Sequence, residues 1–222
     1  MRDTDLFQLA LGLVPPWLVK AASFDAGKKR LDLEIDFKTG GRFACPDCAA
    51  ADCPVHDTVM KEWRHLDFFQ HQAFLHARTP RITCKKCGVK LIAVPWARAG
   101  SGFTLLFEAL AMMLVKHMPV AAAARLMGEH DTRLWRVVFH YVAAAVARMD
   151  LGDLSRVCID ETAAKRGHDY ITLFVDIDRR RVVFIADGHS GSNPDAIEIE
   201  DFVDLDQIDP IYFDHPYYLG PD

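Results

Sequence analysis

The sequence lacks a long, uninterrupted apolar run. Its longest apolar helical stretch, Leu105–Val115, is interrupted by Glu108 and is shorter than the ~20 residues that span a bilayer. The apolar segment Leu6–Val14 is short and ends at Pro15-Pro16, so it does not have the form of a secretion signal. These absences argue against a membrane protein and predict a soluble chain of the cytoplasm.

Basic residues are missing from the end of the chain. Residues 195–222 contain nine acidic residues and no Lys or Arg. The net charge of all 222 residues is −5, yet residues 1–194 contain 26 basic against 22 acidic residues. Because local charge decides contact with phosphate, the acidic total does not exclude a nucleic-acid partner.

Cysteine is scarce, and four of the six cysteines form two Cys-x-x-Cys pairs. Cys45-Pro-Asp-Cys48 is followed, after 35 residues, by Cys84-Lys-Lys-Cys87-Gly88. This spacing matches a zinc ribbon, in which two tight turns supply four thiolates to one tetrahedral ion. Thiols stay reduced in the cytosol, which favours a metal over disulfides. We therefore expect a structural zinc ion bound by Cys45, Cys48, Cys84 and Cys87.

Two further residues near the first pair are alternative zinc ligands. Cys53 and His56 follow Cys48 by five and eight residues, so either could replace a cysteine of the pairs. The competing interpretation is a spare thiol and a surface imidazole.

The hydrophobic pattern divides the chain into segments of different character. Residues 17–43 predict a β-hairpin with strands Trp17–Phe24 and Arg30–Phe37, and the residues around the cysteine pairs predict short strands. Ala, Leu, Met and Val then recur at helical spacing, which predicts three helices: Phe103–His117, Pro119–Met127 and Thr132–Met149. The resulting domain boundaries are 1–41 (hairpin), 42–98 (zinc ribbon), 99–152 (helical segment), 153–190 (strands) and 195–222 (acidic tail).

The last two helices have the form of a helix-turn-helix. A break at Gly128–His130 separates them, Asp131 is a candidate N-cap, and Thr132, Arg133 and Arg136 lie near the start of the third helix. Recognition helices contact base edges at this position. The alternative is an ordinary three-helix bundle, whose core would be formed by Leu134, Val137, Val138, Tyr141 and Val142.

Basic and aromatic residues surround the cysteine pairs. Lys85, Lys86 and Arg98 alternate in this region with aromatic residues such as Trp63 and Trp96. A basic ribbon of this kind favours phosphate contacts. Alternatively, the aromatic residues form a small core and the charges form a solvated face.

Strand character returns after residue 155, and Asp160-Glu161 directly follows the first apolar strand. Further strands are predicted at Tyr170–Ile177 and Arg181–Ala186. A carboxylate in such a meander can hold a divalent ion for phosphoryl transfer. A strand-end turn is the alternative explanation of the Asp-Glu pair.

The run from Cys45 to Gly188 resembles the bacterial insertion-sequence transposases of the ISL3 family. The matching residues are Cys45-Pro-Asp-Cys48, His56, Arg64-His65-Leu66, Cys84-Lys-Lys-Cys87, Ile159-Asp160-Glu161, Lys165-Arg166-Gly167-His168-Asp169-Tyr170, Val175-Asp176 and Asp187-Gly188. The resemblance implies an α+β multidomain chain: an N-terminal β-hairpin and zinc ribbon, a helix-turn-helix segment, and a truncated ribonuclease-H-like β-meander.

The same resemblance implies a function. Asp160 corresponds to the first catalytic aspartate and would bind magnesium, whereas no residue after Gly188 continues the pattern toward the second aspartate and the glutamate of a DDE triad. We therefore expect a truncated, catalytically incomplete transposase that recognises terminal inverted repeats in double-stranded DNA. It would act in the bacterial cytoplasm with the nucleoid, and it could form a homodimer. The alternative is a non-enzymatic DNA-binding regulator.

Residues 196–222 resemble a segment of the bacterial Ku end-joining proteins. These 27 residues are too few to build a Ku barrel or its dimer arm. The combination suggests an insertion sequence interrupted at its junction with a Ku gene, so a non-functional transposase–Ku fusion product is a third possibility.

Overall fold

The structure is a computed structural model that describes residues 2–163, 170–187 and 212–213. The Lys165–Asp169 part of the transposase motif, Gly188, and most of the acidic tail lie outside these described residues. The chain divides into two compact units, Met1–Phe139 and His140–Asp222. No helix among the described residues combines the length and apolar character needed to cross a membrane.

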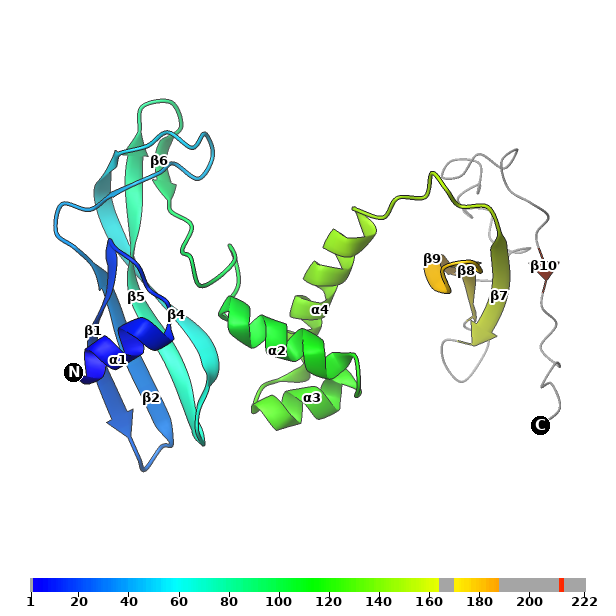
Figure 1. Ribbon diagram of the computed structural model, residues 1–222, viewed down its shortest axis with the longest axis horizontal. Coiled ribbons are helices and arrows are strands. Elements are labelled where there is room, and N and C mark those ends of the chain that lie inside the picture. Colours follow the sequence, from blue (N-terminus) through cyan, green and yellow to red (C-terminus); the bar gives the residue numbers. More distant parts are fainter. Residues whose placement is uncertain (1, 164–169, 188–211, 214–222) are drawn as a thin grey trace. The chain divides into compact units, whose positions relative to one another are not determined.

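A six-stranded sheet forms most of the first unit (Figure 1). Its elements are α1 (Asp3–Ala10), β1 (Trp17–Asp25), β2 (Arg30–Phe37), β3 (Arg42–Phe43), β4 (Cys53–Phe68), β5 (His71–Cys84) and β6 (Gly88–Leu91). The strand order is β1-β2-β5-β4-β3, and β6 pairs with β5. The predicted hairpin and the cysteine-bearing strands thus share one sheet, because β2 pairs with β5 in parallel.

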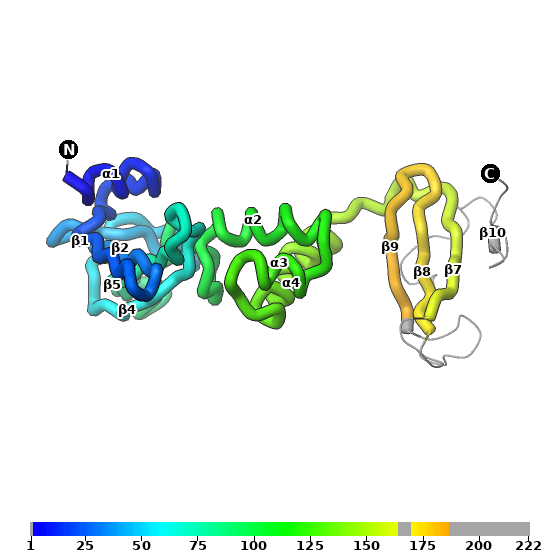
Figure 2. Tube along the Cα trace, turned by 90° about the horizontal axis from the view of Figure 1, so that it is seen from below, coloured from blue at the N-terminus to red at the C-terminus, as the bar shows by residue number. Residues whose placement is uncertain are grey.

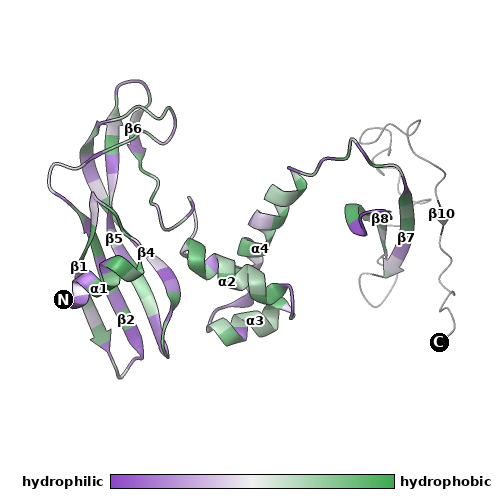
Figure 3. Cartoon of the chain, in the orientation of Figure 1, coloured by the Kyte–Doolittle hydropathy of each residue, from purple (hydrophilic) through white to green (hydrophobic). Residues whose placement is uncertain are grey.

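Alternation of apolar and polar residues explains β2. Leu31, Leu33 and Ile35 are each 2 % exposed, while the polar residues between them lie on the other face. Figure 3 shows that the strands of this sheet carry both hydrophobic and hydrophilic residues along their length. A two-residue period places one set of side chains in the core and the other in solvent.

The prediction of short strands around the cysteine pairs is confirmed for β3 and β6, which have 2 and 4 residues, but it was wrong for β4 and β5. β4 has 16 residues and β5 has 14, and they pair from the ribbon end to the Phe68–His71 turn. Trp63 and Trp96, considered above as part of a basic surface, are 4 % and 8 % exposed, and their ring centroids lie 5.6 Å apart. These two aromatic residues therefore belong to the core of the sheet.

Helix α1 was not predicted. Its Gln8 side chain donates to the carbonyl oxygen of Leu13 at 2.7 Å and accepts from the backbone N–H of Val19 at 2.7 Å. Phe7 packs against the sheet core. The Gln8 hydrogen bonds thus attach this short helix to the start of β1, and Phe7 attaches it to the core, although helical periodicity alone gave no signal.

Three helices follow the sheet, as predicted: α2 (Leu105–Val115), α3 (Val120–Met127) and α4 (Asp131–Val146). Thr104 caps α2 by accepting a hydrogen bond from the Phe107 N–H. Gly128 ends α3 with a φ of 65°, a left-handed conformation that favours glycine. α4 begins at Asp131 itself, one residue before the predicted start at Thr132, so Asp131 is the first residue of the helix and not the residue before it.

The second unit contains a small antiparallel sheet of β7 (Val157–Ala163), β8 (Tyr170–Asp176) and β9 (Arg181–Asp187), which lie side by side in Figure 2. A two-residue strand, β10 (Tyr212–Phe213), pairs in parallel with β7. β8 and β9 agree with the prediction. β7 continues to Ala163, so Asp160 and Glu161 lie within this strand and do not follow it as predicted. β10 was not predicted.

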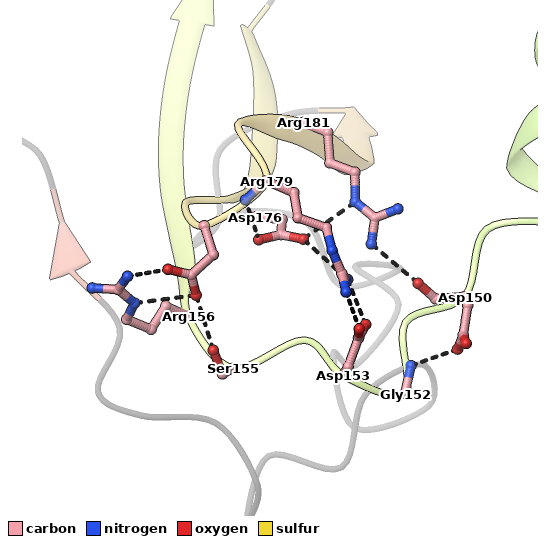
Figure 4. A network of polar contacts seen from close by, with 9 residues as sticks. Asp150, Gly152, Asp153, Ser155, Arg156, Asp176, Arg179 and Arg181 are labelled. Atoms are coloured by element: carbon pink, nitrogen blue, oxygen red, sulfur yellow. Dashed lines mark hydrogen bonds and ion pairs between the residues drawn. The ribbon is translucent and has the colours of Figure 1, made fainter.

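An ionic network ties the segment before β7 to the turn between β8 and β9 (Figure 4). Asp176, which is 2 % exposed, accepts from Arg181 at 3.2 Å and from the backbone N–H of Arg179 at 3.1 Å. The Arg179 guanidinium also binds Asp153, and Arg156 binds Asp178. A buried carboxylate needs such partners, so Asp176 stabilises this sheet.

Candidate metal centre and nucleic-acid interface

The two cysteine pairs meet at one end of the first sheet. Cys45 and Cys48 lie in the loop between β3 and β4, Cys84 ends β5, and Cys87 lies in the turn to β6. Their four sulfur atoms all lie within 4.8 Å of one another. Among the residues that the structure describes, these four form the one group of three or more His, Cys, Asp or Glu close enough to hold a metal.

Local backbone geometry builds each turn. In the first, the N–H of Ala49 donates to the Cys45 carbonyl oxygen, and the Cys45 N–H donates to that of Ala50, both at 2.9 Å. In the second, Gly88 has a φ of 75° directly after Cys87. This left-handed conformation favours glycine, so Gly88 lets the chain turn from Cys87 into β6.

The sulfur geometry and electrostatics fit zinc. A tetrahedral ion about 2.3 Å from each thiolate separates the sulfur atoms by roughly 3.8 Å, and the sulfurs of Cys48 and Cys84 lie 3.6 Å apart. Backbone N–H groups of Cys87 and Lys86 lower the pKa of Cys84 to about 6. A hydrogen bond with Cys48 and burial raise the pKa of Cys87 to about 12. Four thiols this close cannot all ionise unless a cation lies between them.

Cys53 and His56 lie outside this cluster. The Cys53 sulfur contacts the Ala50 carbonyl oxygen at 3.4 Å, and burial raises the pKa of this thiol. His56 is exposed on β4. The four paired cysteines satisfy tetrahedral coordination without either residue.

Of the basic residues predicted to contact DNA near the ribbon, Lys85 and Lys86 are exposed in the second cysteine turn. Arg98 has a different environment. Its Nε donates to the Glu108 carboxylate at 2.9 Å, and Glu108 is fully buried and also accepts from Ser101 Oγ at 2.6 Å. Arg98 thus compensates a buried charge, and its contact with DNA stays a prediction.

The three predicted residues of α4 do not share one environment. Thr132 and Arg136 are exposed, on the side opposite the buried Leu134 and Val137. Arg133 instead donates to Glu129 at 2.5 Å, and its guanidinium carbon lies 4.3 Å from the centre of the Phe103 ring. The predicted core position Val142 is 48 % exposed.

A buried arginine joins the helix-turn-helix to the sheet. Arg64 of β4 is 1 % exposed, and its guanidinium carbon lies 5.3 Å from the ring centres of both Phe74 and Phe107. It donates to the carbonyl oxygens of His65 and Ala73 and to the Asp67 carboxylate.

Glu129 extends this contact into α4. Its carboxylate lies 3.9 Å from Arg64 Nε and also accepts from Arg133. Two backbone hydrogen bonds also join Arg64 to the segment before α2. The Arg64 N–H donates to the Gly102 carbonyl oxygen, and the Thr104 N–H donates to the Arg64 carbonyl oxygen. The sheet therefore fixes the orientation of the helix-turn-helix through β4.

His65 makes the stability of this junction depend on pH. Burial lowers its pKa from 6.5 to about 4, and its Nδ1 lies 2.8 Å from Thr104 Oγ1. Between pH 6.5 and about 4, His65 takes up a proton in the unfolded chain but stays neutral in the folded chain. The free energy of unfolding therefore falls as the pH falls, by at most about 1.4 kcal/mol per pH unit. We expect His65→Gln to reduce this slope in urea unfolding between pH 7 and 5, and equal slopes for the two chains would contradict the assignment.

Asp160 lies on β7, opposite Leu173 of β8, and is exposed. Within residues 2–163, 170–187 and 212–213, it does not belong to any group of three or more potential metal ligands. Magnesium binding at Asp160 therefore stays a prediction from resemblance.

Comparison with known proteins finds family models that match the ribbon and the helices. The zinc-finger of transposase IS204/IS1001/IS1096/IS1165 matches residues 41–87, and the helix-turn-helix domain of transposase family ISL3 matches residues 92–142. The ribbon and the helices are therefore similar to two consecutive domains of ISL3-family transposases. The predicted resemblance is therefore confirmed for the part that carries the cysteine cluster and α2–α4.

Two curated relatives of this ISL3 region are similar over a longer stretch. The transposase for insertion sequence element IS1557 from Mycobacterium tuberculosis is 32 % identical over 199 residues, which cover 85 % of this chain and 44 % of the relative. The IS1001 transposase from Bordetella parapertussis is 28 % identical over 149 residues, covering 66 % of this chain and 36 % of the relative. The chain thus spans less than half the length of either transposase. No solved structure matches it significantly.

The C-terminal part is similar to Ku proteins. The Ku70/Ku80 beta-barrel domain matches residues 154–222. Non-homologous end joining protein Ku 1 from Geotalea uraniireducens is 64 % identical over 26 residues, which cover 12 % of this chain and 10 % of that protein. The Ku match begins earlier than the predicted tail at residue 195 and overlaps the IS1557 similarity, so β7–β9 fall within both.

Proposed function

We propose that this chain binds double-stranded DNA at the terminal inverted repeats of an insertion sequence. The zinc-bound ribbon and α4 would act together, with Thr132 and Arg136 facing the bases. The observation that carries this proposal is the exposed face of α4 on a helix-turn-helix of ISL3 type, held to the sheet by Arg64 and Glu129. Thr132 and Arg136 near the start of a recognition helix are in position to reach base edges.

The charges of the ribbon support a phosphate contact beside the base contacts. Lys85 and Lys86 are exposed at the second cysteine turn, whereas Arg98 and Arg133 each neutralise a carboxylate of the protein. Contacts with phosphate determine how strongly affinity falls with salt. We therefore assign phosphate binding to Lys85 and Lys86, and base contact to Arg136.

The test is a selection of duplexes from a random 40-base-pair library by the zinc-loaded chain, followed by fluorescence anisotropy on the selected duplex. We expect a defined sequence, and an affinity that falls roughly ten- to 100-fold in Arg136→Ala. Arg81→Ala is the matched control, because Arg81 is exposed on β5 and pairs with Asp57 at 2.6 Å. Selection of no sequence, or equal losses in both variants, would contradict the function.

We also propose that residues 1–222 on their own bind DNA without cutting it. Two-metal phosphoryl transfer needs several converging carboxylates, and Asp176, the buried acid of β8, is already bound by Arg179 and Arg181. This favours the regulator alternative, in which the chain occupies the repeats without transposing them. The selected duplex should remain intact with magnesium, and cleavage that disappears in Asp160→Asn would overturn this view.

A further inference from the structure

Two large aromatic side chains lie on the exposed face of α4. Trp135 is 42 % exposed and Phe139 is 64 % exposed, and their rings stack with centroids 5.5 Å apart and planes at 28°. Together with Thr132 and Arg136 they occupy positions i, i+3, i+4 and i+7, which is one face of a helix. We call these four residues the reading face.

The fold does not explain these aromatic residues. Leu134 and Val137 supply the buried side of α4, at 0 % and 1 % exposed, and Arg133 packs on Phe103. A recognition helix that contacted phosphate alone would have no use for two exposed rings beside Arg136. The reading face thus combines a basic group, a hydroxyl and an apolar surface.

We propose that Trp135 and Phe139 contact thymine 5-methyl groups in the major groove, next to a base read by Arg136. This inference rests on the proposed DNA-binding function and specifies its chemistry. Thymine is the one base that presents a methyl group there, and apolar side chains recognise it by direct contact. Arginine, in turn, pairs with guanine O6 and N7. The selected sequence should therefore place thymines beside a guanine.

A second copy of the chain is the competing occupant of this face. Symmetric pairing would bring the same patch of each copy together and would place Arg136 close to Arg136 of the other copy. None of the four residues of the reading face is acidic, so such a contact would lack a compensating charge. The phosphates that flank the groove supply that compensation, which favours DNA.

The experiment replaces thymine by uracil, one position at a time, in the duplex selected by the unaltered chain. The exchange removes the 5-methyl group and leaves base pairing intact. We expect one to three positions at which uracil weakens binding by roughly three- to fivefold, the size expected for losing one buried methyl group. In Trp135→Ala or Phe139→Ala, uracil at one of these positions should have no further effect.

Matched variants separate this inference from the proposed function. Met113→Ala, which alters a 54 % exposed apolar residue of α2, and Arg136→Ala should both keep the uracil response. Equal uracil effects in the unaltered chain and in both aromatic variants would overturn the thymine contact while leaving DNA binding in place. Loss of a dimer in Trp135→Ala by light scattering, with an unchanged uracil response, would assign the face to a second copy. Failure to select any duplex would instead contradict the proposed function itself.

Discussion

Removing zinc, by chelation or by Cys84→Ser, is expected to unfold the first sheet, starting at its ribbon end, and to weaken DNA binding by at least about 100-fold. A structural zinc contributes about 10–16 kcal/mol of apparent binding free energy in small zinc domains, which is comparable with the whole stability of an ordinary domain. Cys84 ends β5, the strand that pairs with β2, β4 and β6. Loss of its thiolate therefore frees one end of the strand on which the rest of the sheet is assembled.

Zinc content and urea unfolding measure this effect directly. The unaltered chain should carry one zinc ion, and Cys84→Ser should carry none and lose the unfolding transition of the sheet. Cys53→Ala is the matched control, because Cys53 is buried near the cluster but is not one of its four members. It should keep the ion. A folded sheet without zinc in Cys84→Ser would show that the hydrophobic core is sufficient.

The cysteine cluster could be predicted because its signal is local. Each Cys-x-x-Cys pair specifies one tight turn, and the two turns need only be brought together. The length of the strands that do so was harder to predict. Pro80 lies inside β5, and proline lacks the N–H that a strand interior normally donates, so this stretch had the pattern of shorter elements.

The positions of the helices could also be predicted, but the direction of their charged side chains could not. Arg133 and Arg136 lie three residues apart on the same helix. Glu129 and Phe103 bind Arg133, while Arg136 is exposed. Phe103 lies before α2, far away in sequence, so periodicity within α4 gives no indication of it. The buried Glu108 that binds Arg98 was missed for the same reason.

The strands of the second unit show a different limit of prediction from sequence. Runs of strand-forming residues predicted β8 and β9 to within one residue, whereas β7 continues through Asp160 and Glu161, which were expected to follow it. Half-buried antiparallel strands share one simple pattern, a two-residue alternation. The same period occurs in a ribonuclease-H-like core and in a Ku barrel, and both similarities extend over these strands. Pattern therefore specifies the strands but not the larger fold, and function has to be argued from the site.

Arg64→Ala is expected to destabilise the first unit by about 3–5 kcal/mol, the largest effect of any single substitution outside the cysteine cluster. The change empties a volume between Phe74 and Phe107 and removes the partner of Asp67 and of two carbonyl oxygens. It also removes one of the two arginines near the Glu129 carboxylate and leaves only Arg133 to compensate that charge. Urea unfolding followed by tryptophan fluorescence measures the loss, since Trp63 is the residue next to Arg64.

A matched arginine tests whether burial is the cause. Arg81→Ala removes an ion pair with Asp57 in which both side chains are 40 % or more exposed, and such surface pairs contribute about 0–1 kcal/mol. Arg64→Lys keeps the charge but loses the planar fork that binds several acceptors at once, so its cost should fall between those of the two alanine variants. If all three variants lay within about 1 kcal/mol of the unaltered chain, Arg64 would not join the helix-turn-helix to the sheet. If the order is instead Arg64→Ala, Arg64→Lys, Arg81→Ala, and DNA affinity follows it, then the orientation of α4 depends on this one buried side chain of β4.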